Sequence, residues 1–137
     1  MHRIADTFGP IPYVNYGSSS LYDALDLVYN KFFEELDNAI EVLSNYVNGN
    51  VDAKLMSDYD CVYGGDVEKW VKFANTLRLR LAIRVSYANP TLAEAQAKKS
   101  MENMFGFIES KAERAELSHN SLEYHHPLHE IAYNFNS

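Results

Sequence analysis

Apolar residues recur at helical spacing in three stretches of the chain, and the clearest of them spans residues 66–88. One stripe of this stretch comprises Trp70, Phe73, Ala74, Leu77, Leu81, Val85 and Ala88, and a second beside it comprises Leu79, Ala82 and Ile83. Spacing of three and four residues is typical of a helix with a buried face. Because the apolar surface covers so much of the girth, we expect a central helix packed between neighbours.

The start of this helix is marked by local backbone chemistry. Gly64 and Gly65 permit a chain reversal, and Asp66 can then cap the first free amide groups. The arginines at 78, 80 and 84 interrupt the apolar pattern. We expect each of them to find a carboxylate or to extend to water.

A second helix is predicted from a cap at Ser20, with Asp23 three residues on, to about Val47. Its apolar stripe comprises Leu25, Val28, Tyr29, Phe32, Leu36, Ala39, Ile40 and Leu43. Asn48-Gly49-Asn50 should end it, because these residues tolerate left-handed conformations. Residues 51–65 then form a connector.

A third helix should follow Asn89-Pro90 and begin at a capping box formed by Thr91 and Glu94. Its predicted buried side comprises Ala97, Met101, Met104, Phe105 and Ile108. Residues 1–7 suggest the last turns of another helix, which Gly9 and the prolines after it would stop. From Glu109 on we expect irregular structure, closing with a helical turn near residues 129–134.

These elements suggest an all-α fold of stacked helical hairpins with long irregular loops. The sequence shows no clean repeat period, so the tetratricopeptide-repeat type is what the family resemblance given below implies. At 137 residues the chain suits one domain. Its net charge of −7 and the lack of a basic block argue against nucleic acid as a partner. Cys61 is the only cysteine, so an internal disulfide is impossible, and no apolar run reaches the ~20 residues that span a bilayer.

Three clusters of polar residues are candidates for a catalytic or metal site. His125, His126 and His129 include an i, i+4 pair that could share a metal, but Pro127 disfavours a helix through the pair, and a structural role is the better interpretation. The carboxylates at 34, 35 and 37 fit a solvated helix face better than a glycosidase pair. The serines at 18–20 lack a nucleophile elbow. We therefore expect no catalytic set, no metal site and no cofactor.

Aromatic residues are the candidates for ligand contact. Trp70 could stack on a sugar ring, although its place on the apolar stripe favours the core. Four tyrosines in predicted loops are better candidates, because tyrosine offers a ring to stack and a hydroxyl to bond; they are Tyr13, Tyr16, Tyr59 and Tyr63. The alternative is that these tyrosines pin their loops to the scaffold.

The run from Tyr63 through Arg84 resembles the signature helix of the SusD/RagB family of surface-exposed nutrient-binding lipoproteins. The resemblance rests on the Y-G-G-D turn, the Lys69-Trp70 pair, the Lys-Phe-Ala-Asn run and the Leu-Arg-Leu-Arg-Leu-Ala repeat. The turn after residue 5, Asp6-x-x-Gly9-x-x-Pro12-Tyr13, is similar to a segment inside the family's chain. The match is weaker after Asn89.

The resemblance implies a non-enzymatic protein that binds glycan or another nutrient and delivers it to a SusC-like TonB-dependent transporter at the outer membrane. It also implies that the chain is an interior slice of a larger protein, whose signal peptide and lipid-bearing cysteine lie upstream. Such a slice would expose apolar surface and tend to self-associate. Two alternatives stay open: a helical-repeat scaffold for protein–protein interaction and, further off, an enzyme such as a glycosidase.

Overall fold

A computed structural model describes residues 1–17, 21–50, 52 and 54–117. Its helices are α1 (His2–Phe8), α2 (Leu25–Gly49), α3 (Val67–Val85) and α4 (Pro90–Met101), followed by the short 3-10 helix η1 (Lys111–Glu113). Within these residues the only β pairing consists of two isolated bridges, Ile11 with Asp23 and Lys54 with Asp66. The predicted all-α class is confirmed.

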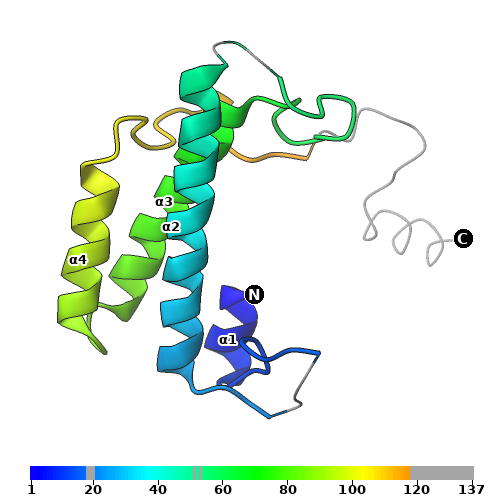
Figure 1. The fold of residues 1–137 in the computed structure, drawn as a ribbon. Coiled ribbons are helices and arrows are strands. Elements are labelled where there is room, and N and C mark those ends of the chain that lie inside the picture. Colours follow the sequence, from blue (N-terminus) through cyan, green and yellow to red (C-terminus); the bar gives the residue numbers. More distant parts are fainter. Residues whose placement is uncertain (18–20, 51, 53, 118–137) are drawn as a thin grey trace, which may run out of the picture.

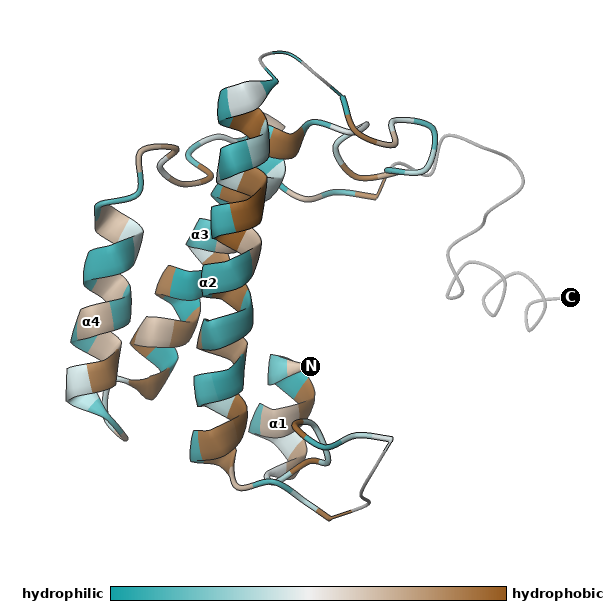
Figure 2. Ribbon diagram, viewed as in Figure 1, coloured by the Kyte–Doolittle hydropathy of each residue, from teal (hydrophilic) through white to brown (hydrophobic). Residues whose placement is uncertain are grey.

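The helix α3 lies in the middle of the structure, packed against both α2 and α4 (Figure 1). The three helices run alternately up and down, so α2 with α3 and α3 with α4 form two helical hairpins (Figure 1). Hydrophilic and hydrophobic residues both occur on every helix, as expected when one face is buried (Figure 2). The expected central helix and hairpins are therefore present, while repetition of the tetratricopeptide type stays a prediction.

The start of α3 is as the sequence predicts. Gly64 and Gly65 have φ angles of 60° and 82°, and the Asp66 side chain accepts a hydrogen bond from the backbone N–H of Lys69. The helix ends at Val85, short of Ala88. Arg78 pairs with Asp37 and Arg84 with Asp6, while Arg80 is exposed to water, so the expectation for the three arginines is confirmed.

The predicted start of α2 is wrong. The helix begins at Leu25, with Ala24 as its N-cap, and Ser20 lies outside the described residues. The carboxylate of Asp23 accepts hydrogen bonds from the backbone N–H groups of Tyr13 and Val14, both at 2.8 Å. Asp23 therefore binds the preceding loop to the start of α2 and does not take part in a capping box.

The predicted start and buried face of α4 are also wrong. Asn89 caps the helix by accepting from the N–H of Leu92, so Thr91 lies inside the first turn. The buried residues are Ala93, Gln96 and Ser100, whereas Met101 and Met104 are 69% and 79% exposed. The remaining predicted residues, Ala97, Phe105 and Ile108, are half-buried.

The reason for this different face lies in contacts from α3. The side-chain amide of Asn75 donates to the carbonyl oxygens of Ser100 and Gly106, at 3.0 and 2.8 Å. The hydroxyl of Thr76 accepts from the N–H of Ile108 at 3.0 Å. These bonds draw the chain across α3 after Met101. The apolar residues beyond that point, although spaced as in a helix, therefore do not continue α4.

The core consists of two clusters along α2 and α3. The larger one joins α1, α2, α3 and α4, and includes Ala5, Val28, Phe32, Phe33, Leu81 and Ala93. The smaller one contains Ile40, Val71 and Ala74. Half of the predicted α2 stripe is buried, namely Val28, Tyr29, Phe32 and Ile40, and Leu36, Ala39 and Leu43 are half-buried. Leu25 is 38% exposed, and Phe33 is buried in addition. No helix in the described part of the chain is long and apolar enough to cross a membrane.

Candidate ligand-binding surfaces

Residues 54–66, here called the signature loop, are folded around the carboxylate of Asp60. This carboxylate accepts hydrogen bonds from the backbone N–H groups of Val62, Tyr63 and Gly65 and from the indole N–H of Trp70, all between 2.8 and 3.2 Å. Burial opposes ionisation of Asp60, but these bonds outweigh it and lower its pKa to about 2. Asp60 thus fixes the loop onto the start of α3.

The second glycine of the Y-G-G-D turn is required by close backbone contact. The carbonyl of Gly65 accepts a hydrogen bond from the N–H of Leu55 at 3.0 Å, so the beginning and the end of the loop lie against each other. A Cβ atom on Gly65 would lie 2.8 Å from the carbonyl oxygen of Leu55, whereas one on Gly64 would meet nothing within 4 Å. Only glycine fits at position 65 without a shift of the backbone.

The aromatic residues of the motif pack on one another. The ring of Trp70 makes edge contacts with Tyr63 and Phe73, with centroids 5.1 and 5.7 Å apart. The hydroxyl of Tyr63 donates to the backbone carbonyl of Glu113 at 2.9 Å, and Tyr63 is buried. Trp70 is half-buried and its only polar atom is bonded to Asp60. Trp70 therefore belongs to the packing around the loop, as its sequence pattern favours.

The contacts that hold the signature loop also include η1. The Lys72 ammonium lies 2.9 Å from Oε1 of Glu113, and Oε2 of Glu113 accepts from the N–H groups of Glu109 and Ser110. The bond from Lys72, followed by the backbone N–H groups, lowers the pKa of Glu113 to about 2. The signature loop, the start of α3 and η1 are thereby held as one unit.

The four candidate tyrosines do not come together. Tyr13 and Tyr16 precede α2 and Tyr59 and Tyr63 follow it, so the two pairs lie at opposite ends of a 25-residue helix about 37 Å long (Figure 1). Tyr13 packs edge-on against Phe32, and its hydroxyl donates to Glu35; burial and this bond raise its pKa to about 12. Tyr16 and Tyr59 are 81% and 82% exposed.

The carboxylates of α2 are engaged with neighbouring side chains. Glu34 pairs with Lys31, Glu35 accepts from Tyr13, and Asp37 bridges Arg78 of α3 and Lys99 of α4. Each of Glu34, Glu35 and Asp37 therefore has a partner within the protein.

The histidines at 125, 126 and 129, the serines at 18–20 and the predicted turn at 129–134 all lie outside the described residues. Among the residues that the structure does describe, no group of three or more His, Cys, Asp or Glu side chains could hold a metal ion. Cys61 is exposed on the signature loop.

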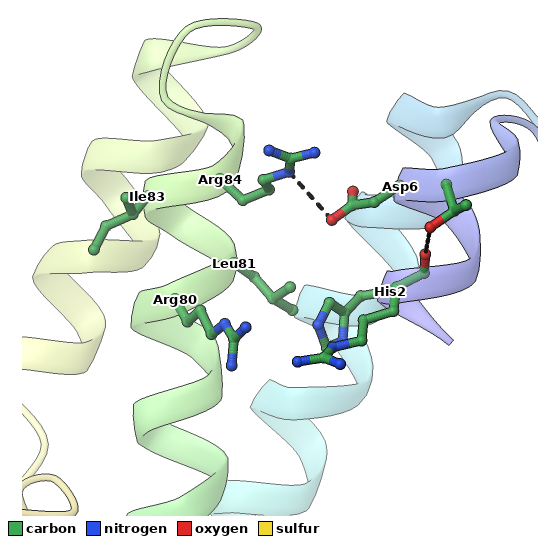
Figure 3. A pocket seen from close by; sticks show the side chains of 8 residues that line it. His2, Asp6, Arg80, Leu81, Ile83 and Arg84 are labelled. Atoms are coloured by element: carbon green, nitrogen blue, oxygen red, sulfur yellow. Dashed lines mark hydrogen bonds and ion pairs between the residues drawn. The ribbon is translucent and has the colours of Figure 1, made fainter.

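Sequence reasoning missed a hollow of about 450 Å³ between α1 and the second half of α3 (Figure 3). Asp6 of α1 connects its two walls: Oδ2 lies 3.1 Å from Nε of Arg84, and Oδ1 accepts from the hydroxyl of Tyr29 at 2.6 Å. Arg80 lies one turn from Arg84 and lines the same hollow. The spacing of Arg80 and Arg84, one helical turn apart, can be seen in the sequence. It indicates a shared hollow only once the position of α1 beside α3 is known.

A second hollow, of about 550 Å³, shares Asp6 and Arg84 with the first and extends towards the start of α4. Its polar lining includes Asp26, Asn30 and Asn89, and its apolar lining includes Leu25 and Leu92. Carboxylate and amide groups that alternate with apolar carbon suit a ligand rich in hydroxyl groups.

Comparison with known proteins identifies relatives of one kind. The family model described as "SusD-like: Susd and RagB outer membrane lipoprotein" matches residues 1–137. No curated protein matches the chain. The chain spans only about a quarter of the length of the solved relatives that it matches.

Three solved structures illustrate the similarity. A SusD homolog from Bacteroides uniformis is 44% identical, with a TM-score of 0.77 over 85% of this chain and 24% of its own. A chitin-binding SusD homolog from Flavobacterium johnsoniae is 37% identical, with a TM-score of 0.87 over 98% of this chain and 28% of its own. A SusD homolog from Bacteroides vulgatus is 38% identical, with a TM-score of 0.84 over 97% of this chain and 27% of its own. With a family model matched from end to end and relatives above 30% identity, the chain belongs to the SusD/RagB family of outer membrane lipoproteins.

Proposed function

We propose that this chain is part of a non-enzymatic glycan-binding protein of the outer membrane. The observation that carries the proposal is the similarity, at 37% identity over 98% of the chain, to a SusD homolog whose own description is chitin-binding. The chain would form an interior part of the helical scaffold of a larger protein of this family.

The described surface offers groups suited to such a role. Tyr16 and Tyr59 present exposed rings on which the apolar face of a sugar can stack. Tyr13 and Tyr63 are held by their hydroxyls and by ring contacts, so we assign them to positioning the loops. The second hollow adds amide and carboxylate groups that can orient sugar hydroxyls.

The test is calorimetric titration of the chain with chitohexaose, a neutral oligosaccharide. We expect saturable binding that weakens roughly threefold to tenfold when Tyr16→Ala or Tyr59→Ala removes a stacking ring. Tyr87→Ala is the matched control, because Tyr87 is fully exposed but lies at the turn between α3 and α4. Absence of heat at millimolar sugar would contradict the proposal.

The proposal includes delivery of the glycan to a TonB-dependent transporter from the cell surface. Co-purification of the transporter with the intact lipoprotein from outer membranes tests the partnership, and labelling of whole cells tests the surface position. The protein should leave chitohexaose uncleaved on prolonged incubation. Release of shorter sugars, seen by chromatography, would show an enzyme.

A further inference from the structure

The hollow between α1 and α3 is a local concentration of positive charge on an acidic protein. Its lining contains Arg3, Arg80 and Arg84 but only one carboxylate, that of Asp6. The whole chain carries a net charge of −7. Like charges that converge on one depression repel each other, so this arrangement favours an anion inside it.

The single carboxylate does not neutralise the whole group. Asp6 already pairs with Arg84 and accepts from Tyr29, which uses both of its oxygens. Arg3 and Arg80 form no ion pair with any residue in the described part of the chain. Two guanidinium groups thus remain available on opposite walls, one from α1 and one from α3.

The field inside the hollow also acts on His2, which lies beside Arg80 (Figure 3). Burial lowers the pKa of His2, and the positive charge of Arg80 lowers it further, against the opposing effect of Asp6. Burial is the largest cause of this shift, and Arg80 acts in the direction expected of a positive charge near the ring.

We propose that this hollow binds the anionic group of an acidic oligosaccharide, a carboxylate or a sulfate ester, between Arg80 and Arg3. The planar fork of a guanidinium matches both groups with two parallel hydrogen bonds. The exposed side chain of Ile83, which also lines the hollow, supplies apolar surface for the sugar ring. This inference rests on the proposed function and names a class of ligand for it.

The experiment is calorimetric titration of the chain with trigalacturonate, which carries carboxylates, and with a κ-carrageenan tetrasaccharide, which carries sulfate esters alone. We expect at least one of them to bind, and Arg80→Gln or Arg3→Gln to weaken that binding roughly tenfold to a hundredfold. Arg80→Lys should recover part of the loss, since it restores the charge without the fork. Binding of one sugar and not the other identifies the anionic group.

Two controls distinguish binding in this hollow from nonspecific electrostatic attraction to the protein. Arg114→Gln removes an exposed arginine beyond α4, paired with Glu116, and should leave binding unchanged. The methyl ester of trigalacturonate, which is neutral, should lose whatever affinity trigalacturonate has. Folding of each variant is checked by thermal unfolding, and Arg80 and Arg3 are both exposed, so it should be preserved.

The outcomes distinguish this inference from the proposed function. If chitohexaose binds and neither acidic sugar does, the anion site is wrong while glycan binding stands. If an acidic sugar binds equally to the wild type, Arg80→Gln and Arg3→Gln, the anion site is again wrong. If no sugar binds, both are wrong.

Discussion

The polar side chains near the two ends of α3 differ in how fully they are hydrogen-bonded or paired within the protein. At its N-terminal end, Asp60 accepts four hydrogen bonds inside the signature loop, and Glu113 is bonded to Lys72 and two backbone N–H groups. At its C-terminal half, Arg84 shares Asp6 with Tyr29, and Arg80 faces a hollow without a carboxylate partner in the described part of the chain. One end is internally satisfied and the other is open to a ligand.

This difference shows that one recognisable run of sequence, from Tyr63 through Arg84, contains both polar groups used within the protein and one, Arg80, that is not. The Y-G-G-D turn and Trp70 are explained by loop anchoring, since their polar atoms are used within the protein. Arg80 belongs to the Leu-Arg-Leu-Arg-Leu-Ala repeat of the same run but forms no ion pair in the described part of the chain, and Arg3 lies outside the run. We therefore expect substitutions of Asp60 and Gly65 to change stability, and substitutions of Arg3 and Arg80 to change the binding of an acidic sugar.

The largest effect is expected for Asp60→Ala. It leaves three backbone N–H groups and the Trp70 indole without their acceptor, and we expect a loss of about 3 kcal/mol in the free energy of unfolding. Urea denaturation measures it. Asp58→Ala is the control, because Asp58 is exposed on the same loop and should cost less than about 0.5 kcal/mol. Equal losses for the two variants would refute the anchoring role.

A smaller loss is expected for Gly65→Ala, about 2 kcal/mol in the free energy of unfolding. Its φ of 82° disfavours a side chain, and the new Cβ would approach the backbone oxygen of Leu55. Gly64→Ala has a similar positive φ in open space and should cost about 1 kcal/mol. The difference between the two melting curves isolates the contact with Leu55; identical curves would show that the contact yields without cost.

Acid should loosen the signature loop only at unusually low pH. The pKa of Asp60 is lowered to about 2 from an ordinary value near 3.8, so its contribution to stability is complete above about pH 4. As the pH falls towards 2, the unfolded state binds more protons and that contribution is lost. Fluorescence of Trp70, the only tryptophan, should report a midpoint near pH 2 that disappears in Asp60→Asn. A midpoint near pH 4 would mean that Asp60 is not bonded as described.

The smallest effect on stability is expected at the open end. Asp6→Asn breaks an ion pair whose Arg84 side chain is 61% exposed, and such pairs contribute little. Asparagine still accepts from Tyr29, so the free energy of unfolding should fall by less than about 1 kcal/mol. A double-mutant cycle with Arg84→Gln measures the coupling directly. A coupling free energy as large as the loss expected for Asp60→Ala, about 3 kcal/mol, would contradict the difference between the two ends of α3.

Features of the fold that depend only on residues adjacent in the sequence could be predicted from residue type. The positive φ angles of Gly64 and Gly65 and the cap at Asp66 follow from residue type alone. The central position of α3 follows from its wide apolar surface. These features needed no knowledge of distant parts of the chain.

Features that depend on distant partners could not be predicted in this way. Asp23 was expected in a capping box, but it binds the backbone at residues 13 and 14. The buried face of α4 is set by bonds from Asn75 to Ser100 and Gly106, 25 and 31 residues away. The hollow forms because residues near 3 and 80 meet in the folded chain. No spacing within one element encodes that contact.

The contrast between the two ends is tested most directly by nuclear magnetic resonance of the labelled chain titrated with trigalacturonate. The Nε–Hε signals of Arg3 and Arg80 should shift and saturate with added trigalacturonate, or with the κ-carrageenan tetrasaccharide if that is the sugar that binds, while backbone signals of the signature loop stay in place. Shifts confined to residues 54–66, or no shift with either acidic sugar at any concentration, would contradict the assignment of the hollow between α1 and α3 as the anion-binding site.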